Sequence, residues 1–109
     1  MIRLRRLPLY AASAGALLLT ASTAAAAPRE YVVVIEKMKF GAVAPTLRKG
    51  DSIVWINRDI FRHTATAANH SFDVDLPPGA KVRMVLKSTG SIPFICRYHP
   101  GMRGVLRVK

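Results

Sequence analysis

Apolar and polar residues alternate over short runs along most of the chain, and no long stretch has helical periodicity. Tyr31 to Ile35 is a β-branched run, and apolar residues occupy both faces between Ile53 and Asn57. Val82, Met84 and Leu86 recur at every second position. These patterns predict short strands separated by turns. We expect them at 31–35, 53–57, 64–67, 81–87, 92–95 and 104–108, with a half-buried alternation at 37–40. Six or seven such strands predict an all-β antiparallel sandwich or barrel.

The breaks between these runs carry turn residues. Lys49-Gly50-Asp51 is typical of a turn, and Leu76-Pro77-Pro78-Gly79 is a strong breaker. The segment 68–71 is expected to be a loop, which makes His70 a surface residue. Met38 and Met84 have strand-like spacing and are predicted to belong to the core.

The first 26 residues have the pattern of an export signal. Three arginines at positions 3, 5 and 6 precede an apolar run from Leu7 to Leu19, and Ala24 to Ala27 fits a small-residue cleavage site. We expect cleavage after Ala26, which leaves a mature domain of residues 27–109 in the periplasm. The alternative is a retained anchor, because residues 7–27 carry no charge, although they are only weakly hydrophobic.

Charge and cysteine content narrow the function of the mature part. Cleavage leaves 83 of the 109 residues, enough for one small domain. It also leaves 14 of the 17 basic side chains against 6 acidic ones, a net charge of +8. An exported protein rarely meets nucleic acid, so an acidic protein partner or an anionic membrane surface is the expected target. The single cysteine excludes an internal disulfide, and a metal is one occupant that would protect it.

The richest chemistry lies in Cys96-Arg97-Tyr98-His99-Pro100-Gly101-Met102, which holds a thiol, an imidazole and a thioether. A type I or type II turn over 99–102 would bring His99 and Met102 together, because Pro100 fixes φ and Gly101 accepts either turn. His63 is the leading candidate for a fourth ligand. A thiolate, two imidazoles and an axial thioether make a blue-copper electron-transfer site.

Other interpretations of these residues stay open. Taken singly, His63 is an ordinary loop histidine, Cys96 a small buried hydrophobe and Met102 core filler. A zinc site is the chemical alternative for the same Cys-His-His set. Copper is favoured by its higher affinity for such ligands and by the soft thioether.

The combined pattern resembles the cupredoxin family, and most closely its amicyanin branch among plastocyanin-like proteins. The resemblance rests on the Cys-x-x-His-x-x-Met spacing, on Trp55-Ile56-Asn57-Arg58 followed by His63, and on Leu76-Pro77-Pro78-Gly79 and Met102-Arg103-Gly104. It covers almost all of the mature chain. It implies a Greek-key β-sandwich that holds one copper ion through His63, Cys96, His99 and Met102, with Asn57 and Thr64 beside the ligands.

The resemblance also implies a role for the surface around the site. His99 would be the electron port, and Pro100, Arg97 and Arg103 would lie where a partner docks. Partners in the family include c-type cytochromes and quinoprotein dehydrogenases. This chain departs from the family pattern at three places. Arg97-Tyr98 replaces an expected Thr-Pro, and Gly101 replaces a bulky apolar residue. Thr64 stands where an asparagine often bridges the ligand loops.

Three functions follow from these observations. The leading hypothesis is a soluble, monomeric electron carrier without enzymatic activity. Arg62, Arg97 and Arg103 flank the proposed ligands and would steer an acidic partner; the alternative is that they are solvated and point away from the site. The second is a copper-binding or delivery protein without redox turnover, although the chain has no Met- or His-rich run. The third is a fragment of a copper enzyme. The chain has three histidines and the proposed site uses two, so too few ligands remain for a second copper centre.

Overall fold

The computed structural model describes residues 2–20 and 26–109 of the chain. Residues 2–20 form neither helix nor strand. Across both described ranges, no helix is long and apolar enough to cross a membrane. Ala24 and Ala25 of the predicted cleavage motif lie outside the described residues, so the motif itself stays a prediction.

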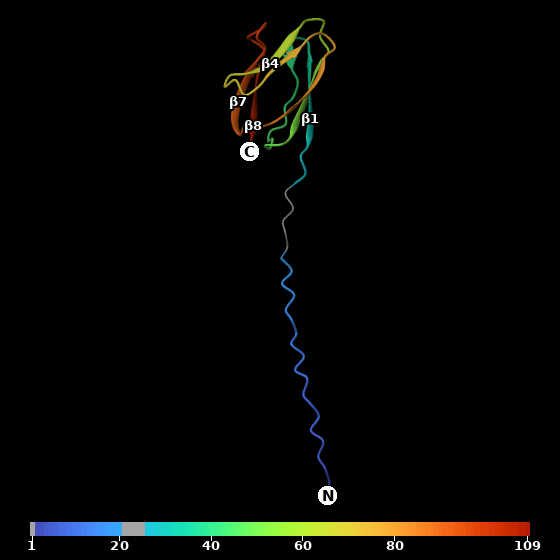
Figure 1. Cartoon of the computed structure of the whole chain (residues 1–109). Helices are drawn as coiled ribbons and strands as arrows, with labels where there is room; N and C mark the ends of the chain where they lie inside the picture. The colour runs from blue at the N-terminus through green and yellow to red at the C-terminus, as the bar shows by residue number, and fades with distance from the viewer. Residues whose placement is uncertain (1, 21–25) are drawn as a thin grey trace.

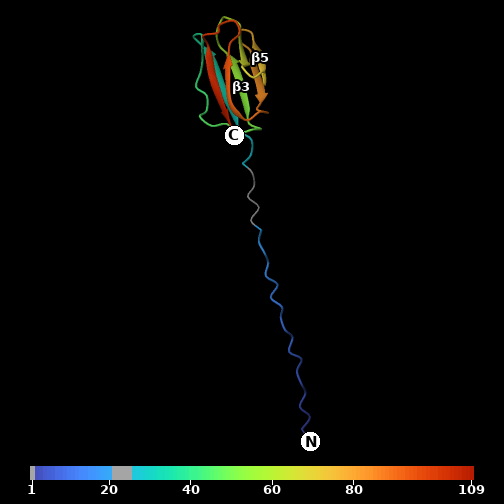
Figure 2. The same ribbon diagram turned by 90° about the vertical axis from the view of Figure 1, so that its left-hand side faces the viewer.

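The domain is a sandwich of two four-stranded sheets that face each other (Figures 1 and 2). Eight strands occur in the described ranges, one more than the upper expectation, and no helix does. One sheet has the order β2-β1-β3-β6 and the other β5-β4-β7-β8. The strands are β1 (Glu30–Glu36), β2 (Lys39–Phe40), β3 (Ser52–Asn57), β4 (His63–Ala67), β5 (Asp73–Leu76), β6 (Lys81–Val85), β7 (Gly90–Ile95) and β8 (Arg103–Val108).

The expectation of a purely antiparallel sandwich is wrong at one pair of strands. β1 and β3 are parallel, with Glu30 opposite Ser52 and Ile35 opposite Asn57. Parallel neighbours need a crossover connection. The chain provides one by crossing to the other sheet, where Leu47 forms a parallel bridge with Val108 before the chain returns into β3. Both strands therefore end at the same end of the sandwich, near the candidate site.

The predicted alternation at 37–40 is strand only over its last two residues. Lys37 and Met38 have φ values of 52° and 60°, so they form a tight turn between β1 and β2. Non-glycine residues rarely adopt this left-handed conformation. A carboxylate of the candidate site, that of Asp59, accepts hydrogen bonds from both amides of this turn.

Aromatic rings fill the space between the sheets. Trp55 of β3 and Phe94 of β7 have no exposed surface, and their ring centroids lie 5.3 Å apart in an edge-on arrangement. Phe40 contacts Phe94 in the same manner at 4.8 Å. Edge-on aromatic pairs add to the free energy gained by burying their area. The both-faces-apolar pattern of β3 is explained by its central place between β1 and β6.

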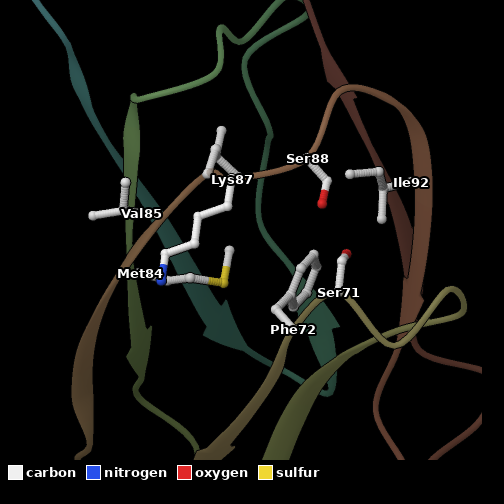
Figure 3. Close-up of a pocket in the computed structure, with 8 residues that line it drawn as sticks. Ser71, Phe72, Met84, Val85, Lys87, Ser88 and Ile92 are labelled. Atoms are coloured by element: carbon white, nitrogen blue, oxygen red, sulfur yellow. The ribbon is translucent and has the colours of Figure 1, made fainter.

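A cavity of about 180 Å³ lies near the end of the sandwich that is remote from the candidate site (Figure 3). Phe72, Met84 and Ile92 line it together with residues of the segment after β6. Met38 and Met84 both pack against the core cluster, as their spacing predicted.

Gly104 allows the central aromatic ring to pack against β8. A Cβ atom at this position would overlap the ring of Phe94. Because Phe94 is enclosed by Trp55 and Phe40, it cannot move aside freely. Gly104→Ala is therefore expected to lower the free energy of unfolding by about 1–3 kcal/mol, as overpacked cores usually do. Urea denaturation measures this change. Gly101→Ala is the matched control, since no atom lies within 4 Å of its Cβ position, and an equal loss in both variants would contradict the explanation.

Asp51 joins two segments at the start of β1 and β3. Its carboxylate accepts hydrogen bonds from the amides of Arg29 and Arg48, each at 2.9 Å. These bonds hold the pKa of Asp51 below its usual range. A carboxyl whose pKa is lower in the folded state stabilises the protein above its unfolded pKa, and that contribution is lost as pH falls through the folded pKa.

Asp51→Asn is accordingly expected to destabilise the domain at neutral pH and to weaken its sensitivity to acid. The difference between the two unfolding free energies should shrink as pH falls through the range where aspartates protonate. Urea denaturation across that range measures it. A difference that stays constant with pH would mean that the charge of Asp51 has no part in stability.

Candidate metal centre

Two buried side chains from distant parts of the sequence meet at one end of the sandwich. His63 begins β4, and Cys96 directly follows β7; neither has exposed surface. His63 Nδ1 lies 3.7 Å from Cys96 Sγ. The sequence analysis named both residues as candidate ligands of one metal ion.

The segment after Cys96 folds back on itself through three backbone hydrogen bonds. The amide of Met102 donates to the carbonyl of His99 at 2.8 Å, which closes the predicted turn. The amide of His99 donates to Cys96, and the amide of Cys96 donates to Met102. Gly101 does not have a positive φ, so the turn is of type I rather than type II. Met102 is buried beside the cysteine as a result.

The outer nitrogen of His63 is held by a carboxylate. Asp59 Oδ2 lies 2.8 Å from His63 Nε2, and the Asp59 carboxylate also accepts from the amides of Lys37 and Met38. Burial raises the pKa of Asp59, but the hydrogen bonds from Met38, His63 and Lys37 outweigh it and leave that pKa below its usual range. An ionised carboxylate must accept from Nε2–H, so Nδ1 is the nitrogen with a free lone pair facing Cys96.

This carboxylate explains the left-handed turn before β2, because its oxygens bind both amides of that turn. Sequence reasoning did not single out Asp59. The signal available was an acidic residue four positions before a candidate histidine ligand. A partner of this kind fixes the orientation of a ligand histidine.

Asn57 organises the loop that leads into His63. Its side chain is 1% exposed, and Nδ2 donates to the carbonyls of Phe61 and Leu76, each at 2.8 Å. Its Oδ1 accepts from the amide of Asp59 at 2.9 Å. One buried amide group therefore fixes both Asp59 and the entry into β4.

Thr64 connects the two candidate ligand segments. Its backbone amide donates to Cys96 Sγ at 3.4 Å, and its hydroxyl accepts from the amide of Arg97 at 2.9 Å. The bridge that the family often builds with an asparagine is thus made here by a threonine hydroxyl.

His99 is only partly buried and lies at the surface of the site. Its ring centroid is 5.3 Å from that of His63 and 6.3 Å from that of Phe61. Ile60, Phe61 and Tyr98 are 83%, 50% and 53% exposed, an apolar contribution to this surface that sequence reasoning did not single out. Pro100 is exposed beside them, whereas His70 lies exposed on the separate 68–71 loop.

The structure brings some predicted ligands together more closely than others. Within the described ranges, no three His, Cys, Asp or Glu side chains form a group that could hold a metal ion. His63 and Cys96 are adjacent, and His99 and Met102 lie in the loop that surrounds them. The close pair is therefore the firmest part of the geometry.

Two of the three arginines near the site are paired with aspartates of β5. Arg62 binds Asp75 at 2.6 Å, and the guanidinium of Arg97 lies 3.6 Å from Asp73. Arg62 lowers the pKa of Asp75, and Asp75 raises that of Arg62. These pairs offset much of the positive charge that the sequence places beside the site. Arg103 is exposed and forms no ion pair with the residues that the structure describes.

The donor set fits a copper ion. Bonds as long as those of zinc, about 2.1 Å to nitrogen and about 2.3 Å to sulfur, place two donor atoms about 3.8 Å apart when the angle between them is about 120°. The observed separation of Nδ1 and Sγ, 3.7 Å, is close to this distance. A separation of 3.7 Å is within reach of a weak hydrogen bond to sulfur, and it also leaves room for both atoms to bind one ion. A soft thiolate and an imidazole suit copper.

The chain belongs to the family of cupredoxin-like domains. Residues 9–108 match this family, which covers the sandwich and all the candidate ligands. Amicyanin from Paracoccus versutus is 29% identical over 93 residues, spanning 79% of this chain and 70% of that protein. The expected family is thereby confirmed.

Solved structures of amicyanin are similar to the domain. A reduced Cu(I) form of an amicyanin variant at pH 4 superposes with a TM-score of 0.63 at 25% identity, covering 80% of this chain and 87% of that one. A second Cu(I) variant gives 0.61 at 26% identity, covering 77% and 86%. The predicted all-β cupredoxin-like sandwich is confirmed by these likenesses.

Proposed function

We propose that this protein is a periplasmic type 1 copper protein that carries single electrons between redox partners. The observation that carries the proposal is the buried pair of His63 and Cys96, with Nδ1 and Sγ 3.7 Å apart, in a cupredoxin-like domain. The similar amicyanin structures include an oxidised form and a reduced Cu(I) form, which supports a redox role for the same fold.

The proposed ligands are His63, Cys96, His99 and Met102. Copper would supply a Cu(II)/Cu(I) couple when bound there. Asp59 holds His63 with Nδ1 facing the thiol, and the amide of Thr64 donates to Cys96 Sγ and so fixes the position of the sulfur. Burial of three of the four ligands excludes water, so the surroundings change little between the two charge states.

His99 is the proposed exit and entry point for electrons. It is the one candidate ligand with a partly exposed ring, and the exposed side chains of Phe61, Tyr98 and Pro100 surround it. Electron-transfer complexes are usually small and short-lived, and an apolar rim of this kind suits them. Arg103 adds a positive charge at its edge.

The proposed partners are redox proteins such as a c-type cytochrome or a quinoprotein dehydrogenase. The net charge of +8 on residues 27–109 favours an acidic docking surface on them. Export depends on the proposed signal peptide at 1–26, and the mass of the protein recovered from the periplasm tests cleavage after Ala26.

Electron carriage and copper delivery are distinguished by a redox cycle. The copper-loaded domain should accept one electron per molecule, return it to an oxidant, and keep its copper through repeated cycles. Reductive and oxidative titrations, followed by measurement of bound copper, test this. Loss of copper on reduction, with transfer to a chelating acceptor, would support the alternative of copper binding and delivery instead.

A further inference from the structure

A chain of polar side chains runs away from the site on the outer face of β4 and β5. Thr64 Oγ1 lies 2.9 Å from Thr66 Oγ1, and Thr66 Oγ1 donates to Asp73 Oδ1 at 2.8 Å. Thr66 and Asp73 are opposite each other in the sheet. The same oxygen of Asp73 lies 3.6 Å from the guanidinium of Arg97, whose backbone amide donates to Thr64. The contacts therefore form a closed ring.

The hydrogens of this ring have one arrangement. An ionised carboxylate can only accept, so the hydroxyl hydrogen of Thr66 is directed at Asp73. Thr66 then has no hydrogen left for Thr64, and Thr64 must donate to it. The oxygen of Thr64 is left to accept from the Arg97 amide. All the donors thus point along one path from the Arg97 amide to Asp73, and such chains strengthen each of their bonds.

We propose that Asp73 and Thr66 are positioning residues for the Cys96 thiol and act on it through Thr64. Asp73 sets the rotamer of the Thr66 hydroxyl, which sets that of Thr64. Thr64 then holds the amide that follows Cys96, while its own amide binds the sulfur. Asp73 lies 23 positions before Cys96 in the sequence and contacts no candidate ligand in this network. Its effect on a bound metal rests on the proposed function, but its effect on the cysteine segment does not.

The test uses metal-free full-length protein and the hydrogen exchange of the Arg97 amide. Thr66→Val removes the hydroxyl at constant shape, and Asp73→Ala removes the end of the path. Each should accelerate Arg97 exchange about three- to tenfold relative to the Trp55 amide in the other sheet, the loss expected for one weakened hydrogen bond. Reaction of Cys96 with a disulfide reagent should accelerate in the same variants.

Two matched controls separate positioning from general stability. Thr66→Ser keeps the hydroxyl and should restore slow exchange. Asp75→Ala breaks the ion pair with Arg62 two residues along the same strand and should leave Arg97 unchanged. Unaltered Arg97 exchange in Thr66→Val, or equal acceleration in Asp75→Ala, would overturn the proposal.

The copper-loaded variants provide a second readout. Thr66→Val and Asp73→Ala should shift the thiolate-to-copper absorption and the reduction potential, whereas Thr66→Ser and Asp75→Ala should not. Accelerated Arg97 exchange in a protein that takes up no copper would uphold the positioning role and defeat the proposed function. If Thr66→Val and Asp73→Ala bind copper with unchanged spectra and also show unaltered Arg97 exchange, the proposed function would stand and the positioning role would be defeated.

Discussion

Cys96→Ser is expected to abolish the visible thiolate-to-copper absorption of the copper-loaded protein. The absorption requires a sulfur ligand, and Cys96 is the only cysteine in the chain. Serine matches the shape of cysteine, and its alcohol is a much poorer ligand for copper at neutral pH. Copper affinity should fall as well, by an order of magnitude or more, because the soft ligand is lost. Absorption spectroscopy and equilibrium dialysis measure the two effects.

The fold should survive this change. Cys96 is fully buried, and its sulfur makes only weak contacts, with the amide of Thr64 and with His63 Nδ1. His70→Asn is the control for histidine ligation, since asparagine tolerates the positive φ of 61° at that exposed position. It should leave the spectrum unchanged. A Cys96→Ser protein that retains the absorption would show that the copper lies elsewhere.

Asn57→Leu is expected to destabilise the domain by about 2–4 kcal/mol, the largest effect on stability that a single polar substitution at the site should have. The side chain is almost completely buried, and its removal leaves the carbonyls of Phe61 and Leu76 without their donor. The amide of Asp59 loses its acceptor at the same time. A buried polar group without a partner lowers the free energy of unfolding by the full cost of removing that group from water.

The substitution should also loosen the candidate metal centre. Asn57 fixes the loop that holds Asp59 and leads into His63. Copper affinity should therefore fall along with stability, because a looser loop no longer holds the proposed ligand in place. Urea denaturation and copper titration measure the two effects in one preparation. Asn69→Ala, which removes only an exposed bond to the Ser71 amide, should change stability by no more than about 0.5 kcal/mol. Equal losses in the two variants would refute the role given to Asn57.

The sequence predicts the elements of this fold better than their pairing. The β-branched run of β1 and the alternation of β6 are local patterns, and both are strands. The parallel alignment of β1 with β3 depends on how residues 41–51 cross to the other sheet, which no local pattern encodes. The short β5 escaped prediction because aspartates are unfavourable in strands, although Asp73 and Asp75 alternate with buried Val74 and Leu76.

The candidate ligands are predictable for two different reasons. Cys96, His99 and Met102 lie within seven residues, and a proline-directed turn brings them together locally. His63 is 33 positions away, so the sequence could name it only as a candidate, which the family resemblance then supported, because only tertiary structure brings it to the loop. Asp59, Thr66 and Asp73 act through contacts between strands and loops, so their roles became visible only in three dimensions.

The most direct test of the central claim is the visible absorption spectrum of the purified mature domain during titration with Cu(II). The account predicts a strong thiolate-to-copper band that saturates at one copper per protein, disappears on reduction and returns on oxidation. A protein that binds copper without this band, or that develops none at all, would contradict the assignment of His63, Cys96, His99 and Met102 as a blue-copper centre.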